Sequence, residues 1–174
     1  MITNATKDKQ SILADWNRHN YPLIEGVEYK EVSNVIKHSG WLTELFRPEW
    51  FTNKEIDQVF KIALQPGVVS AWHKHPLTTD RLSIVTGIIG LVLFDDRVGS
   101  PTNGMINEFR LSELRPGTVQ IPPGVWHGIQ NLHHEISMLL NLTDKAYQYE
   151  DPDHWRIPFN DPQIPYLFDK NKIL

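Results

Sequence analysis

Three histidines and one aspartate in this chain have the types and the spacing to carry out acid–base or metal chemistry. His73 and His75 lie two residues apart, so in a strand both side chains project from the same face. Asp80 follows a turn rich in Pro and Thr, and His127 lies in the stretch IPPGVWHGIQN. Imidazole and carboxylate groups move protons near neutral pH, and they also bind Fe, Mn, Ni, Cu or Zn. These four residues are the first candidates for a functional site.

Short strands are the elements that the sequence predicts for positioning these side chains. Apolar or alternating runs recur at roughly ten-residue spacing and are bounded by turn residues such as Gly and Pro. The runs cover residues 27–32, 41–46, 56–64, 82–85, 88–94, 106–111, 118–121 and 136–142. No helical pattern of ordinary length interrupts them, which argues against a βαβ architecture. The sequence therefore predicts an all-β sandwich or barrel.

The chain length and composition predict a single globular domain over residues 1–174. A chain of 174 residues with 40% hydrophobic residues can bury one sizeable core. We expect an N-terminal arm or short helix at 1–20, because its apolar residues form only one weak stripe. A barrel is expected at 21–146, and the Pro/Asp-rich tail at 147–174 is expected to pack on it as an irregular segment or short helical turn.

Composition excludes several classes of function. A net charge of −4 gives no global reason to expect a nucleic-acid partner. The absence of cysteine excludes disulfides, thiolate zinc sites and cysteine nucleophiles. No apolar run approaches the roughly 20 residues that span a bilayer, and the start MITNATKDKQ lacks the apolar region of a secretory signal. We therefore expect a cytoplasmic protein with no membrane partner.

Two motifs resemble those of the cupin superfamily. The first has the superfamily's spacing, with aspartate in place of the usual glutamate, and consists of Gly67, His73, His75, Asp80 and Gly87. The second consists of Pro122-Pro123-Gly124, His127 and Asn131. Both motifs in this order imply a cupin double-stranded β-helix, a jelly-roll barrel with short helical or irregular extensions at both ends.

The chemistry of the four candidate residues stays open at this point. In metal-binding cupins the two motifs supply three histidines and a carboxylate, which here are His73, His75, Asp80 and His127. Such a set suits a divalent transition metal: Fe, Mn, Ni, Cu or Zn. Alternatively, the histidines face a substrate as acid–base and hydrogen-bonding groups without any metal.

A closer resemblance covers residues 24–168. This region resembles the dTDP-4-dehydrorhamnose 3,5-epimerase family, the RmlC-like sugar-nucleotide cupins. Four motifs carry the resemblance in the correct order: Gly-Trp-Leu-Thr-Glu-Leu-Phe at 40–46, Ser-Pro-Thr-x-Gly at 100–104, Ile-Pro-x-Gly-x-x-His-Gly at 121–128, and Phe-Asn-Asp-Pro at 159–162.

The resemblance implies a reaction that needs no cofactor and a role for two residues. His73 is the implied general base, and Asp161 orients and charges it. The 4-keto group of a nucleotide-linked 4-keto-6-deoxysugar acidifies its neighbouring C–H bonds, and a histidine near its ordinary pKa of about 6.5 can remove that proton. The enolate oxygen then needs a hydrogen-bond donor, for which His75, His127 or a metal is available. Asp161 can instead simply cap a turn in its Asn-Asp-Pro sequence.

The resemblance also implies a nucleotide-sugar ligand and a homodimer. Arg81 lies where the family carries a lysine for the nucleotide diphosphate, and a guanidinium can bind phosphate bidentately. Trp41 and Glu44 match strand positions that line the site, partly that of the neighbouring subunit. The implied homodimer therefore exchanges its N-terminal strands.

One departure from the family pattern leaves three functions open. The family's tyrosine acid aligns with Leu140, which cannot donate a proton, and Tyr147 or Tyr149 is the available substitute. The leading hypothesis is a divergent epimerase or isomerase that acts on a nucleotide-linked 4-keto-6-deoxysugar by proton abstraction at a histidine. The alternatives are a metal-dependent cupin oxygenase or isomerase, and a non-catalytic sugar-binding cupin. We expect the remaining histidines, which include His154, to lie on the surface or in turns.

Overall fold

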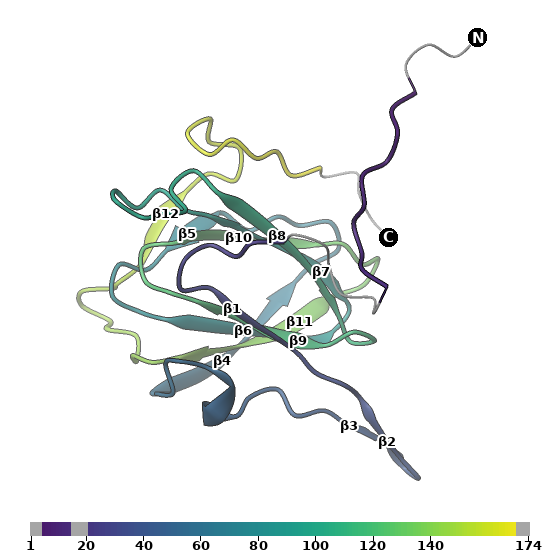
Figure 1. Ribbon diagram of the computed structural model, residues 1–174. Coiled ribbons are helices and arrows are strands. Elements are labelled where there is room, and N and C mark those ends of the chain that lie inside the picture. Colours follow the sequence, from purple (N-terminus) through teal and green to yellow (C-terminus); the bar gives the residue numbers. More distant parts are fainter. Residues whose placement is uncertain (1–4, 15–20, 170–174) are drawn as a thin grey trace.

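The computed structural model describes residues 5–14 and 21–169, and it contains two five-stranded antiparallel sheets stacked face to face (Figure 1). The first sheet has the spatial order β1 (Glu28–Glu31), β9 (Gly117–Ile121), β6 (Asp80–Thr86), β11 (Ser137–Thr143) and β4 (Gln58–Leu64). The second has the order β12 (Trp155–Ile157), β5 (Trp72–Lys74), β10 (Trp126–Asn131), β7 (Ile88–Phe94) and β8 (Ile106–Ser112). Neighbours in space are mostly distant in sequence, which is the topology of a jelly-roll barrel and confirms the predicted fold class.

A small hairpin projects from the barrel on the N-terminal side. It pairs β2 (Val35–Lys37) with β3 (Gly40–Leu42) and is followed by the short 3-10 helix Pro48–Trp50. In Figure 1 the hairpin extends away from both sheets, at the lower right of the molecule. Its strands are exposed along their whole length.

Strand β7 shows how the hydrophobic pattern builds two cores. Nearly all of its residues are buried, as in a strand that is covered on both faces. Leu91 and Leu93 belong to the core inside the barrel. Val92 points to the outer face, where it packs in a second cluster with Trp72 and Phe168. The alternation of side chains along one strand therefore supplies the interior and also anchors the C-terminal tail.

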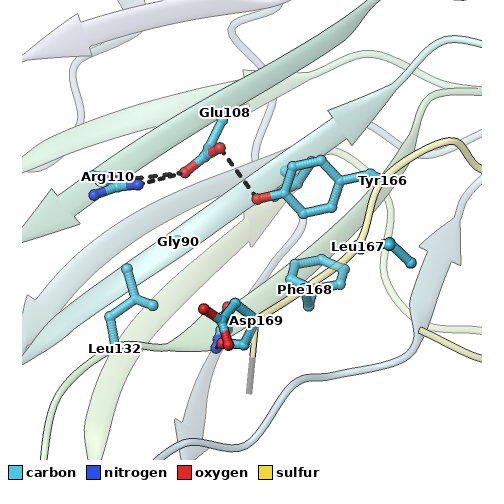
Figure 2. A pocket seen from close by; sticks show the side chains of 10 residues that line it. Gly90, Glu108, Arg110, Leu132, Tyr166, Leu167, Phe168 and Asp169 are labelled. Atoms are coloured by element: carbon cyan, nitrogen blue, oxygen red, sulfur yellow. Dashed lines mark hydrogen bonds and ion pairs between the residues drawn. The ribbon is translucent and has the colours of Figure 1, made fainter. Parts of the chain in front are cut away.

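The C-terminal tail crosses the outer face of the second sheet. Tyr166 Oη donates a hydrogen bond to Glu108 Oε2 at 3.1 Å, beside the ring of Phe168 (Figure 2). Trp72 Nε1 donates to the backbone oxygen of Phe159 at 3.1 Å. These contacts attach the tail to β8 and β5 and fix the path of the chain on either side of them.

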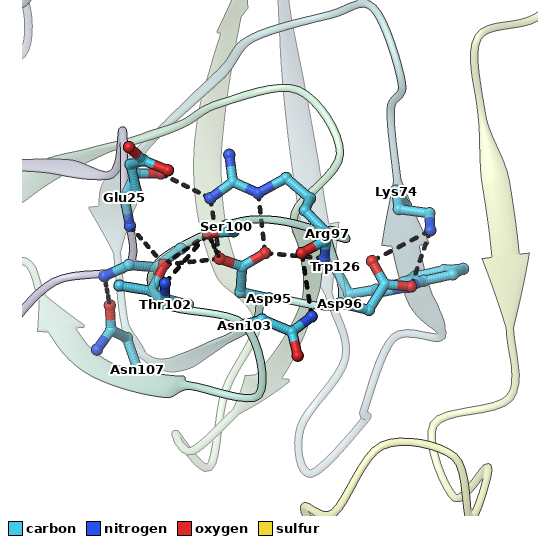
Figure 3. Close-up of polar contacts among 11 residues, drawn as sticks. Glu25, Lys74, Asp95, Asp96, Arg97, Ser100, Thr102, Asn103, Asn107 and Trp126 are labelled. Carbon is cyan, nitrogen blue, oxygen red and sulfur yellow. Dashed lines mark hydrogen bonds and ion pairs between the residues drawn. The ribbon is translucent and has the colours of Figure 1, made fainter.

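A polar network closes the loop after β7 (Figure 3). The buried carboxylate of Asp95 accepts hydrogen bonds from Ser100 Oγ at 2.6 Å, Thr102 Oγ1 at 2.7 Å and Arg97 Nε at 2.8 Å. Burial alone would raise the pKa of Asp95, but these bonds hold it well below its usual range. Thr102 Oγ1 also accepts a bond from the backbone N–H of Glu25 at 2.9 Å. The Ser-Pro-Thr-x-Gly motif therefore fixes this loop and the segment before β1.

Four strands differ from the sequence prediction. The run at 41–46 forms only the short strand β3, and the strands β2, β10 and β12 were not predicted. The tail from residue 147 is therefore not wholly irregular, because β12 pairs with β5. In the described part of the N-terminal arm, residues 5–14, no helix forms. The rest of the predicted arm, 1–4 and 15–20, lies outside the described residues.

Among the described residues, no helix has both the length and the apolar character that crossing a membrane requires.

Candidate active site

A cavity of about 680 Å³ lies between the two sheets and contains the residues of both histidine motifs. Its volume lies in the range of ordinary small-molecule sites. β5, β6 and β10 contribute the polar wall, while β4 contributes apolar side chains. The tail between β11 and β12 closes part of the rim and adds residues 145–148, 151, 153 and 154.

Strand pairing places the predicted histidines together. His73 lies directly opposite His127 in the antiparallel register of β5 and β10, and their ring centroids are 5.9 Å apart. The ring of His75, two residues along β5, lies 5.5 Å from that of His127. The structure therefore brings the three predicted histidines to one wall of the cavity.

Asp80 joins this wall from the facing sheet. Its side chain is only 3% exposed, and its Oδ2 lies 3.3 Å from His75 Nε2 and 3.5 Å from His127 Nε2. Its Oδ1 accepts a hydrogen bond from Asn141 Nδ2 at 2.7 Å. Burial raises the pKa of the Asp80 carboxyl, although His75 and the bond from Asn141 oppose that shift.

Three of the four residues considered as metal ligands form a compact group. One ligand atom each from His75, Asp80 and His127 lies within 4.8 Å of the others, whereas His73 lies outside this group. The same three side chains also form the short polar contacts just described. Their arrangement therefore has an explanation without an ion.

A fourth histidine, which the sequence analysis assigned to the surface, completes the histidine cluster (His73, His75, His127 and His154). His154 lines the cavity, so that assignment was wrong. Its Nε2 lies 2.6 Å from His73 Nδ1, and its ring lies 4.8 Å from that of His75. The cause is the pairing of β12 with β5, which brings the residue before Trp155 beside the two histidines of β5. Such a long-range pairing leaves no local signal in a Pro/Asp-rich tail.

The surroundings of three members of the histidine cluster favour their neutral form. Burial, followed by the neighbouring His127 and His154, lowers the pKa of His73 to about 3. Burial and then His75 lower the pKa of His127 to about 3. The same two causes lower the pKa of His154. At neutral pH these rings are uncharged, and each has one nitrogen with a free electron pair for a hydrogen bond or a proton.

The structure places Arg81 outside the cavity. Its side chain is fully buried, and Nε donates to Gln120 Oε1 at 2.8 Å. The two terminal nitrogens donate to backbone oxygens of Asn53 at 2.7 Å and Glu55 at 2.9 Å. Arg81 therefore attaches the segment before β4 to the first sheet, and no donor of its guanidinium faces the cavity that would hold a phosphate.

The remaining predicted site residues are not brought to His73. Trp41 is 62% exposed on the projecting hairpin, and Glu44 forms an ion pair with Arg47 at 3.4 Å. The Asp161 carboxylate accepts hydrogen bonds from the backbone N–H and the side chain of Gln163, at 2.9 and 3.2 Å. These contacts are those of a turn cap, and Asp161 does not line the cavity.

The departure at Leu140 also has a structural counterpart. The neighbouring residues of β11, Asn141 and Thr143, line the cavity, whereas Leu140 does not. Tyr147 lines the cavity from the tail, while Tyr149 is 86% exposed. Of the two tyrosines considered as substitutes for the family's acid, Tyr147 is the one that lies at the site.

Comparison with known proteins identifies the family. A family model described as dTDP-4-dehydrorhamnose 3,5-epimerase matches residues 23–173. A relative from Haloferax volcanii, described as a probable low-salt glycan biosynthesis epimerase, Agl13, is 37% identical over 142 residues, which cover 80% of this chain and 90% of the relative. The spore coat polysaccharide biosynthesis protein SpsL of Bacillus subtilis is 30% identical over 144 residues, 83% of this chain and 95% of that protein.

Solved structures agree with this match. The dTDP sugar isomerase from Desulfovibrio desulfuricans G20 superposes with a TM-score of 0.76 at 25% identity, and the match covers 83% of this chain and 91% of that one. NovW, a 4-keto-6-deoxy sugar epimerase from Streptomyces spheroides, gives a TM-score of 0.77 at 23% identity over 88% and 80% of the two chains. The second comparison, at this lower identity, supports the fold alone.

Proposed function

The chain belongs to the dTDP-4-dehydrorhamnose 3,5-epimerase family and is a sugar-nucleotide epimerase; from this premise we propose how its cavity performs the reaction. His73 removes a proton from the carbon beside the keto group of a nucleotide-linked 4-keto-6-deoxysugar. The observation that carries this proposal is a half-buried, neutral imidazole on the cavity wall that has one nitrogen engaged and the other available.

The proposed reaction follows from the chemistry of a ketone. The C–H bond next to the keto group breaks, its electron pair forms the enolate, and the proton goes to His73 Nε2. Hydrogen-bond donors must hold the enolate oxygen. We assign this role to the group formed by His75, His127 and Asp80, in which the two Nε2 atoms lie 3.3 and 3.5 Å from a buried carboxyl whose pKa is raised by burial.

Return of a proton from the other side of the sugar needs a second acid. Tyr147 is the proposed donor, because it lines the same cavity and its phenol carries an O–H group that can donate a proton. Leu140 stands on β11 where the family has its tyrosine acid, and in this proposal Tyr147 of the tail replaces that acid.

The proposed ligand is a nucleotide sugar that is held between two protomers. Among the described residues lining the cavity, Lys145 is the one lysine or arginine, so this chain alone offers little charge for a diphosphate. A homodimer in which Trp41 and Glu44 reach the neighbouring site would complete it. The names of both relatives place them in glycan or polysaccharide biosynthesis, and we propose the same setting here. A cytoplasmic location remains a prediction.

The proposed reaction needs no cofactor, as membership of this family implies. The metal-dependent oxygenase or isomerase is therefore not favoured. We also expect that treatment with a chelator leaves the rate unchanged.

Isotope exchange tests the proposal. A panel of dTDP-4-keto-6-deoxysugars is incubated in D2O with the wild type and with His73→Asn, and deuterium at the carbons beside the keto group is measured by NMR. The wild type should incorporate deuterium into at least one sugar, and His73→Asn should do so about 1,000-fold more slowly. Equal rates for the two proteins would remove His73 as the base. Binding without exchange would instead favour a sugar-binding protein.

A further inference from the structure

We propose that His154 is the positioning residue for His73, an inference that rests on the proposed function of His73 as the base. In this arrangement His73 donates its Nδ1–H to Nε2 of His154. The bond fixes His73 in the tautomer whose Nε2 carries a free electron pair. No role of this kind follows from the sequence motifs, which point to Asp161 instead.

The contact between the two rings is short and well oriented for a hydrogen bond. The distance from His73 Nδ1 to His154 Nε2 is 2.6 Å, and the ring centroids lie 4.9 Å apart. Asp161, by contrast, is engaged by Gln163 in its own turn. The partner that the structure gives to the Nδ1 side of His73 is therefore another imidazole.

The segment that carries His154 is attached to the barrel on both sides. After His154, Arg156 pairs with His73 in the register of β12 and β5. Before it, the Asp153 carboxylate accepts hydrogen bonds from the backbone N–H of Leu77 at 2.9 Å and from Thr78 Oγ1 at 2.8 Å. These attachments hold the imidazole of His154 in a fixed place, as a group that orients a base requires.

The direction of the bond follows from proton counting. A hydrogen bond between two neutral imidazoles needs one N–H donor and one acceptor. If His154 donated, the neutral ring of His73 would carry its proton on Nε2 and could accept none from a substrate. Among the described residues, every buried side-chain nitrogen has a hydrogen-bond partner. His73 Nε2 has no such partner, so it is not buried and is open to the cavity. His73 can act as a base only when His154 accepts.

The pair also changes what happens after proton transfer. When Nε2 of His73 takes the substrate proton, the ring becomes an imidazolium, and its Nδ1–H bond to His154 becomes charge-assisted. His154 is less buried than His127, and the bond spreads the new charge toward the rim of the cavity. A neutral acceptor stabilises this charge less than a carboxylate does, which is consistent with a base of low pKa.

Three substitutions separate orientation from simple packing. His154→Phe keeps a planar ring but has no acceptor, whereas His154→Asp restores an acceptor with a smaller side chain. His134→Phe makes the same change at an exposed histidine in the loop after β10, outside the cavity. Rates of deuterium exchange are measured with the sugar that the wild type exchanges, as kcat and KM separately and as a function of pH.

We expect His154→Phe to lower kcat about 100-fold and to change KM by less than about 3-fold, because the tautomer and not the binding of the sugar is lost. His154→Asp should recover at least about 10-fold of that loss and move the acidic limb of the rate profile to higher pH, since a carboxylate favours the imidazolium. His134→Phe should match the wild type. A wild-type kcat for His154→Phe, or equal losses for His154→Phe and His154→Asp, would overturn the proposal.

A second measurement does not depend on turnover. The tautomer of His73 is read from the ¹⁵N shifts and N–H couplings of its ring in the free protein by NMR. The wild type should show the Nδ1–H form, and His154→Phe should lose it. Finding the Nε2–H form in the wild type would reject the inference even if no sugar in the panel is exchanged. If no sugar in the panel is exchanged, the proposed function is rejected. The tautomer measured by NMR still decides the inference about His154 in that case.

Discussion

The proposed base is a histidine whose proton affinity is set by its surroundings more than by its own chemistry. Burial and the adjacent imidazoles of His127 and His154 disfavour the charged form of His73 and lower its pKa to about 3. The ordinary value is about 6.5. The same environment that weakens the base therefore keeps it in its reactive, unprotonated form at all moderately acidic pH values.

This shift predicts an unusual pH profile. A histidine with a pKa of 6.5 would lose about 30-fold of its free-base form between pH 8 and pH 5. With a folded pKa of about 3, His73 is unprotonated over that whole range, so kcat/KM for deuterium exchange should fall less than about 3-fold. The measurement is kcat/KM from pH 8 to 4.5, with circular dichroism to show that the protein stays folded. An acidic limb with its midpoint near 6.5 would contradict this environment for the base.

A second residue-scale prediction concerns the missing acid. Tyr147→Phe removes the hydroxyl that we assign to proton return and leaves His73 and His154 in place. Deuterium exchange by proton removal and return on the same face should continue within about 5-fold, while net inversion at the carbon should fall about 100-fold. The two rates are measured in one NMR experiment. Tyr149→Phe is the matched control, and an equal effect of both substitutions would contradict the assignment.

Arg81 shows what residue-level matching to a family cannot decide. Asp80 and Arg81 are consecutive in β6, and consecutive side chains of a strand point to opposite faces. Asp80 faces the cavity, so Arg81 must face away from it, where Gln120 and two backbone carbonyls bind its guanidinium. The alternation of side chains along a strand can be read from the sequence, and it excludes Asp80 and Arg81 from both facing the cavity. The placement of His73 and His75 on one face was predictable for the same reason, since i and i+2 share a face, whereas only the resemblance of its motif to the cupin superfamily grouped His127 with them.

At the scale of elements, the strands that build the site were the hardest to predict. β10 has the sequence WHGIQN and is fully buried, yet it lacks the alternating or apolar pattern of a strand. His127 and Ile129 line the cavity on one side, and Gly128 leaves room for the tail on the other. β12 has three residues, and only its pairing with β5 makes it a strand. The apolar strand β7 was predicted with its exact ends, because burial on both faces determines its composition.

Close contact at Gly128 gives a test of how firmly the tail is held. A Cβ at Gly128 would lie 2.9 Å from the ring of Phe168 and 3.2 Å from that of Trp72, so the tail would have to move. We expect Gly128→Ala to lower the free energy of unfolding by about 1–3 kcal/mol and to expose the tail to limited proteolysis. Gly90→Ala on the neighbouring strand β7 is the control, since its Cβ would lie 3.4 Å from the end of Leu132. Equal melting temperatures for the two variants would show that the tail does not depend on this contact.

At the scale of the whole molecule, the projecting β2–β3 hairpin needs an explanation. Ile36 is 77% exposed and Trp41 62% exposed, and both lie on an extension that contacts neither sheet through strand pairing. Full burial of one such side chain contributes about 1.5–3 kcal/mol. Exposed apolar surface of this kind marks an interaction site, and we propose a second copy of the chain as its partner.

The homodimer can be tested together with the composition of its active site. The wild type should have a mass of about twice 20.2 kDa by light scattering at micromolar concentration, and Ile36→Glu or Trp41→Glu should give the monomer, because a buried unpaired carboxylate is costly. If the hairpin completes the neighbouring cavity, the monomer should also show KM for the nucleotide sugar raised about 10-fold or more, with an unchanged melting profile of the barrel.

Leu114→Glu, at an exposed leucine between β8 and β9, should change neither mass nor KM. A wild type that is monomeric and fully active would contradict the dimer, whereas monomeric variants with an ordinary KM would confine the partner's role to assembly. Lys145 is the single lysine or arginine among the described residues that line the cavity of one chain, so we expect the monomeric variants to show the raised KM.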